Sequence, residues 1–172
     1  PAFDIVMWPL YNSLYDTDVK YLRVVKDVTD PEITFTDVQL YHSLELAEIH
    51  LTTKDGKKLS ADDIETIDGT SVYSPLYMPK NVFDDNTNTF FHSRGEDRNQ
   101  IQELKITFKS THNIKAIDLW PRQDKGVITR LHHTYVELYN KSDTLLYRAP
   151  LEWNSVAVQH FDVVLMNDGL KW

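Results

Sequence analysis

Short segments in which apolar and polar residues alternate constrain the fold of this 172-residue chain more than any other feature. Successive side chains of a β-strand point to opposite faces, so a period of two predicts strands with one face toward a core. The segments are also rich in β-branched and aromatic residues, which strands favour. They lie at residues 21–25, 33–41, 45–51, 104–108, 114–119, 135–139 and 161–165.

The connections between these segments favour antiparallel pairing. Turn sequences occur at residues 54–57 (Lys-Asp-Gly-Lys) and 141–143 (Lys-Ser-Asp), and such short polar turns join neighbouring antiparallel strands. A helical turn is predicted only at residues 60–63, where Ser60 precedes two acidic residues. The pattern predicts an all-β fold, an antiparallel β-sandwich of jelly-roll type.

The length suits a single domain with one core, so residues 1–172 are expected to form one β-sandwich domain with residues 1–20 as an N-terminal extension. The chain contains no cysteine, which excludes disulfides, thiolate metal sites and a cysteine nucleophile. The first residues include neither a basic leader nor an initiator Met, which suggests a mature or excised module.

Charge and hydropathy limit the partners. The net charge of −8 disfavours non-specific binding to nucleic acid or anionic lipid. No apolar run approaches the ~18 residues that a membrane-spanning helix needs. We therefore expect no nucleic-acid partner and no membrane insertion.

Residues 81–93 (Asn-Val-Phe-Asp-Asp-Asn-Thr-Asn-Thr-Phe-Phe-His-Ser) place many side-chain oxygens close together. Calcium takes six to eight oxygen ligands from carboxylates, carbonyls and hydroxyls, and this segment offers all three. Asp, Asn and Thr also dominate ordinary turns, because their side chains bond their own backbone. Composition alone leaves both interpretations open.

Four motifs follow one another along the chain. Residues 81–86 are similar to Asn-Ala-Ile-Asp-Gly-Asn, 102–108 stand in the place of Trp-Trp-x-Val-Asp-Leu, 114–124 are similar to Ile-x-x-Ile-x-Ile-x-Asn-Arg-x-Asp, and 130–138 stand in the place of Arg-Leu-x-Gly-Ala-x-Val-x-Leu. In this order the chain resembles the galactose-binding-like or discoidin (coagulation factor 5/8 type C) β-sandwich family, and most closely the fucose-binding F-type lectins. The resemblance covers roughly residues 20 to 165.

The F-type lectin signature is a His, then Arg-x-Asp, then a further Arg or Lys. His92, Arg122, Asp124 and Arg130 follow this order, with longer gaps between them than the family has. The resemblance implies a sugar site in which the two arginines donate to hydroxyl groups and the histidine donates or accepts. The aspartate would orient an arginine through a paired contact.

A hexose also has an apolar face, so its site needs a flat hydrophobic surface. Phe91 and Tyr77 are the candidates, and the sequence does not choose between them. Arg94, in the charged loop that follows His92, is a candidate contact at the rim. Without the family pattern, an Arg-x-Asp pair is most simply a solvated ion pair.

Many family members carry a last strand whose Glu reaches calcium. Residues 21–25 and 33–41 match that strand but precede the calcium loop, which suggests a circularly permuted chain with Asp37 in the role of the Glu. The resemblance then implies calcium held by the carbonyl groups of Thr36, Asn81 and Asn86, the carboxylates of Asp37 and Asp84, and Thr89.

No Gly-x-Ser-x-Gly elbow, phosphate loop or His-Glu-x-x-His motif occurs, so we expect no enzyme. A metal-assisted hydrolase using His92, Asp84 and Asp85 is the catalytic alternative. The sequence predicts a non-catalytic, calcium-stabilised lectin-like module that recognises a fucose- or galactose-type glycan at a cell or virion surface, as part of an extracellular multidomain or multimeric assembly. The other alternative is a structural or protein-binding jelly roll of a virion or phage particle that binds no sugar.

Overall fold

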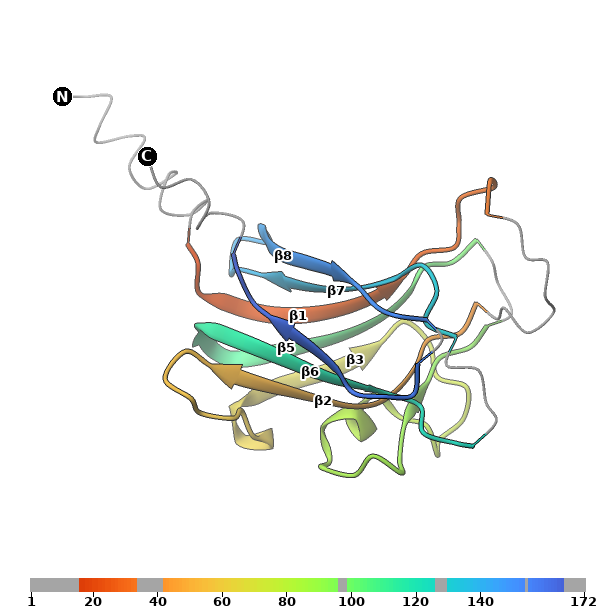
Figure 1. The fold of residues 1–172 in the computed structure, drawn as a ribbon, viewed down its shortest axis with the longest axis horizontal. Helices are drawn as coiled ribbons and strands as arrows, with labels where there is room; N and C mark the ends of the chain where they lie inside the picture. The colour runs from red at the N-terminus through yellow and green to blue at the C-terminus, as the bar shows by residue number, and fades with distance from the viewer. Residues whose placement is uncertain (1–15, 34–41, 96–98, 126–129, 154, 166–172) are drawn as a thin grey trace.

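A computed structural model describes residues 16–33, 42–95, 99–125, 130–153 and 155–165. Two β-sheets face each other as the layers of a β-sandwich (Figure 1). Every strand pair in both sheets is antiparallel. The all-β prediction and the antiparallel sandwich are confirmed.

The first sheet has five strands in the order β3-β5-β1-β7-β8. They are β1 (Val19–Lys26), β3 (Ile64–Gly69), β5 (Gln102–His112), β7 (Thr134–Tyr139) and β8 (Leu145–Pro150). The second has four in the order β4-β2-β6-β9, namely β2 (Glu45–Thr53), β4 (Phe91–His92), β6 (Ile114–Pro121) and β9 (Gln159–Asp162). Two short 3₁₀ helices, η1 (Ala61–Asp63) and η2 (Pro79–Phe83), lie in the connections.

The core lies between the sheets and follows the period of two. On β5, Leu104, Ile106 and Phe108 are buried while the residues between them are partly exposed. On β1, Leu22 and Val24 belong to the same cluster of buried side chains. Alternation therefore marks the central strands, because each of them buries one full face.

Most of the predicted strands are present. The segments at 21–25, 45–51, 104–108, 114–119 and 135–139 lie within β1, β2, β5, β6 and β7. The predicted strand at 161–165 is shifted, since β9 ends at Asp162. The predicted strand at 33–41 falls almost entirely outside the described residues. The turn at 60–63 is η1, where the Asp63 carboxylate accepts a hydrogen bond from the Ser60 backbone N–H at 2.8 Å.

Three strands were not predicted. β3 and β8 are the two edge strands of the first sheet, and most of their residues are exposed or half-buried. An edge strand that buries little apolar surface shows weak alternation. β4 has only two residues and pairs with the start of β2.

An irregularity in β2 determines which of its side chains lie on the outer face of the second sheet. The register with β6 shifts between Leu46 and Glu48. Leu46 and Ile49 lie in the core although they are three residues apart. Glu45 and Glu48, which a regular strand would place on opposite faces, therefore both lie on the outer face of the second sheet.

Candidate functional site

Glu45, the first residue of β2, has a fully buried carboxylate on which two arginines and a histidine converge. Its Oε1 lies 2.7 Å from Arg122 Nη1 and 3.2 Å from His92 Nε2. Its Oε2 lies 3.1 Å from Arg130 Nη1. We call Glu45, His92, Arg122, Asp124 and Arg130 the Glu45 cluster.

Local structure explains how these side chains meet. His92 lies on β4, directly across the ladder from Glu45. Arg122 follows the last residue of β6, the strand on the other side of β2. Arg130 has a positive φ of 57°, a left-handed conformation that few residues other than glycine adopt. The structure brings together four residues that the sequence predicted as sugar contacts, although the contacts themselves stay a prediction.

The second carboxylate of the cluster belongs to Asp124, which accepts a hydrogen bond from Arg122 Nε at 2.7 Å. Burial acts to lower the pKa of Arg122, but the hydrogen bonds to Glu45 and Asp124 outweigh it and raise the pKa. Two arginines thus face two carboxylates. The charges of the cluster's arginines and carboxylates balance.

Lys26 lies beneath the cluster at the end of β1. Its buried Nζ donates to the backbone oxygens of Ser43 at 3.0 Å and Arg130 at 2.6 Å. Burial lowers the pKa of Lys26 to about 7, with Glu45 acting in the opposite direction and Arg130 in the same one. Through its hydrogen bond to the backbone oxygen, Lys26 holds the backbone of Arg130 in place.

Aromatic rings border the cluster. Tyr73 lies 4.7 Å from the His92 ring and Tyr77 stacks on Phe90 at 4.6 Å, both measured between ring centroids. The guanidinium carbon of Arg122 lies 4.3 Å from the centre of the Phe90 ring. Tyr73 is 58% exposed, so a flat aromatic surface beside the cluster faces solvent.

One predicted contact is placed elsewhere. Phe91 is fully buried in the core, because it precedes His92 on β4 and therefore points to the opposite face. Its ring offers no surface to a ligand, and the exposed aromatic neighbour of His92 is Tyr73, which the sequence did not single out. Arg94 is exposed and donates from Nε to the backbone oxygen of Val72 at 3.3 Å.

The predicted calcium loop is a series of side-chain-capped turns. Asp84 accepts hydrogen bonds from the Asn86 backbone N–H at 3.0 Å and the Thr89 hydroxyl at 2.6 Å. Asn86 accepts from the Asn88 backbone N–H at 3.0 Å, and the Asn81 amide donates to the backbone oxygens of Leu76 and Phe90. The other two predicted ligands, Thr36 and Asp37, lie outside the described residues.

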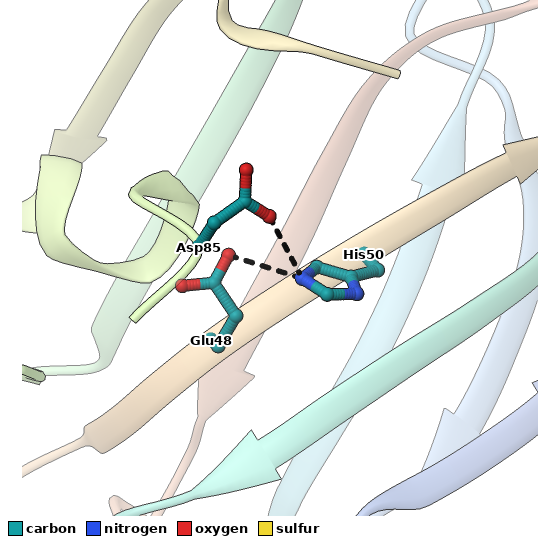
Figure 2. A group of neighbouring side chains, drawn as sticks. All are labelled: Glu48, His50 and Asp85. Atoms are coloured by element: carbon teal, nitrogen blue, oxygen red, sulfur yellow. Dashed lines mark ion pairs between the residues drawn. The ribbon is translucent and has the colours of Figure 1, made fainter. Parts of the chain in front are cut away.

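A third group was missed by the sequence predictions. Glu48 and His50 point out from β2, and Asp85 reaches toward them from the loop after η2 (Figure 2). His50 Nε2 lies 3.5 Å from Glu48 Oε1 and 3.4 Å from Asp85 Oδ1. The signal was present, since a Glu and a His two apart on a strand share a face.

Burial and the neighbouring Asp84 carboxylate raise the pKa of Glu48 to about 8. Burial, and then the charge of Lys58, lower the pKa of His50. At neutral pH the environment thus favours uncharged forms of both side chains.

Within the part of the chain that the structure describes, no helix has the length and hydropathy to cross a bilayer. Comparison of the chain with protein-family models, with curated proteins and with solved structures returns no match.

Proposed function

We propose that this domain is a non-catalytic glycan-binding module whose site is the Glu45 cluster together with Tyr73. The proposal includes a jelly-roll sandwich of the galactose-binding-like type and a fucose- or galactose-type ligand at a cell or virion surface. The observation that carries it is the convergence of His92, Arg122 and Arg130 on one buried carboxylate beside an exposed aromatic ring.

The cluster supplies fixed donors. Each of the three guanidinium nitrogens of Arg122 lies within hydrogen-bonding distance of Glu45 or Asp124. The two terminal nitrogens each carry a second N–H, which a sugar hydroxyl can accept. Because the carboxylates already hold the side chain, little rotamer entropy is lost when a ligand binds.

Charge balance favours a neutral ligand. Arg122 and Arg130 face Glu45 and Asp124, so an anionic sugar would meet no excess of positive charge from these four groups. A neutral hexose needs donors, acceptors and an apolar surface, and Asp124 is also exposed enough to accept from a hydroxyl. Tyr73 supplies the surface on which the apolar face of the ring can lie.

Calcium is the second part of the proposal. The loop from Asn81 to Thr89 leads into His92, so an ion bound there would order the strand that carries a donor of the sugar site. Its carboxylate, carbonyl and hydroxyl oxygens are ligands that calcium accepts.

The test is a glycan array probed with the multivalently displayed domain, in calcium and again in excess chelator, because single shallow sugar sites bind weakly. We expect binding to neutral fucosylated or galactosylated glycans. Tyr73→Ala should abolish it without changing the melting temperature, because the side chain is largely exposed. Trp153→Ala, which removes a half-exposed aromatic ring from the segment between β8 and β9, is the matched control.

A silent array from folded protein, or binding that survives Tyr73→Ala together with His92→Gln, would contradict the proposal. It would favour the second candidate, a structural or protein-binding module of a particle. The observation in favour of that candidate is a set of exposed apolar side chains around β9, an edge strand: Trp153, Val156, Val158 and Val164.

A further inference from the structure

The outer face of β2 carries a second group with ligand chemistry, separate from the Glu45 cluster. Glu48, His50 and Asp85 offer one ligand atom each, and these atoms all lie within 4.8 Å of one another. Figure 2 shows both carboxylates directed toward the same nitrogen of His50.

Glu48 is the unusual member, because acidic side chains are rarely buried, and this one lies within hydrogen-bonding reach of a second acidic side chain, Asp84. The Glu48 side chain is 1% exposed, and Oε2 has no hydrogen-bond partner. His50 Nε2 is also buried and has no hydrogen-bond partner, although it faces two carboxylates. Glu48 Oε1 and Asp85 Oδ1 both face this nitrogen, and a buried nitrogen that two carboxylate oxygens face without bonding it indicates a missing ligand between them.

Two of the three separations between ligand atoms fit a metal ion. Ligands at about 2.0–2.1 Å from a tetrahedral ion lie about 3.4 Å apart, and the nitrogen-to-oxygen distances are 3.5 and 3.4 Å. Ligands of an octahedral calcium ion at about 2.4 Å would lie about 3.4 Å apart as well. Distance alone therefore does not choose the metal.

The types of ligand atom do distinguish between metals. Calcium and magnesium take oxygen ligands, whereas an imidazole with carboxylates suits zinc and its neighbours in the first transition row. We propose that Glu48, His50 and Asp85 bind a divalent transition-metal ion, with zinc as the reference ion and water completing its shell.

The surroundings allow an ion to enter and be held. A cavity of about 350 Å³ is lined by all three ligands and by side chains that include Lys58, Ser60 and Phe83. Asp85 is 74% exposed, so the site opens to solvent on its side. The Trp120 ring lies 4.5 Å from the His50 ring and limits its rotation.

Lys58 competes with the metal. Its Nζ lies 2.6 Å from Asp85 Oδ1, the same oxygen that faces His50. The lysine side chain is half-exposed and can move into solvent when an ion arrives. Removing this ammonium should therefore strengthen metal binding, an effect that a purely structural ion pair would not show.

The experiment titrates the purified, metal-free chain with zinc by calorimetry, and with cobalt(II), whose visible spectrum reports nitrogen ligation and coordination number. His50→Gln and Asp85→Asn should each weaken zinc binding by at least about ten-fold, the loss found even for partners outside the first coordination shell. Lys58→Met should tighten it. Both His50 and Asp85 are partly exposed, so these variants are expected to fold.

His160 provides the matched control. It also lies between two carboxylates, but Asp118 faces its Nδ1 at 2.7 Å and Asp162 faces its Nε2 at 2.9 Å, so no single nitrogen is shared. His160→Gln should leave the zinc affinity unchanged. Unchanged affinity in His50→Gln would overturn the proposal. Calcium displacing zinc at equal concentration would also overturn it and assign the cavity to an all-oxygen site.

Discussion

Replacing Glu45 with Gln tests whether one buried carboxylate organises the Glu45 cluster. Glutamine keeps the shape of the side chain and removes its charge. Arg122 retains Asp124 as a partner, whereas Arg130 loses the carboxylate that lies 3.1 Å away. The variant therefore leaves excess positive charge in a site where the carboxylate had been fully buried.

The contact distances set the magnitude. At an effective dielectric constant of about 20, ion contacts of 2.7 and 3.1 Å contribute about 6 and 5 kcal/mol of gross attraction. Most of this offsets the cost of burying the charges, but removing one partner still destabilises by about 3–5 kcal/mol, because the Arg130 guanidinium stays in a site where its side chain is only 20% exposed. For a domain of this size the melting temperature should fall by about 6–20 °C.

Thermal and urea unfolding measure the effect. Glu65→Gln is the control, since Glu65 is 56% exposed, lies 3.7 Å from Lys20, and should contribute under about 1 kcal/mol. The double variant of Glu45→Gln with Arg130→Gln should lose less than the sum of the two single variants. A melting temperature within about 2 °C of the wild-type value, or fully additive losses, would refute a cluster organised by Glu45.

Three further predictions concern His132, Lys26 and Gly69. The pKa of His132 is lowered to about 3 from 6.5, chiefly by burial, so between pH 3 and pH 6.5 the unfolded chain binds more protons than the folded chain. The free energy of unfolding should therefore fall as the pH falls from 6.5 to 3, and a pH series of urea melts should show a weaker dependence on pH for His132→Gln. The pKa of Lys26 is lowered to about 7 from 10.5, so the free energy of unfolding should rise by up to about 1.4 kcal/mol per pH unit between these values, and the same assay should show no such rise for Lys26→Met. Gly69→Ala would place a Cβ 2.8 Å from the Phe91 ring and should lower stability by about 1–3 kcal/mol in thermal melts, and an unchanged melting temperature would show that the ring can move.

The central strands could be predicted because each buries one face, which places apolar residues at alternate positions of the sequence. Leu104, Ile106 and Phe108 on β5 alternate with partly exposed residues. Edge strands follow another rule. β8 pairs on one side only, through backbone hydrogen bonds with β7, and such bonds leave no trace in side-chain type.

The candidate site could be predicted only in part. His92, Arg122 and Arg130 were expected from a family pattern, but the buried carboxylate that joins them was not. Glu45 stands at the start of a strand whose alternation is interrupted, so its side of the sheet cannot be counted from the strand's apolar residues. The same interruption hid Glu48, and Asp85 reaches it from a loop whose path no local pattern specifies.

Both candidate sites depend on that one irregularity. If β2 kept a regular period between Leu46 and Ile49, one of these two side chains would leave the core, and either Glu45 or Glu48 would turn inward. A carboxylate in the apolar core would cost several kcal/mol. The register shift avoids this cost, because it lets both acidic residues face outward from β2. The Glu45 cluster and the proposed metal site are thus mounted on the same rigid strand, three residues apart. Binding of zinc at Glu48 should accordingly stiffen the strand that positions Glu45, and slower hydrogen exchange at the start of β2 on adding zinc would show it.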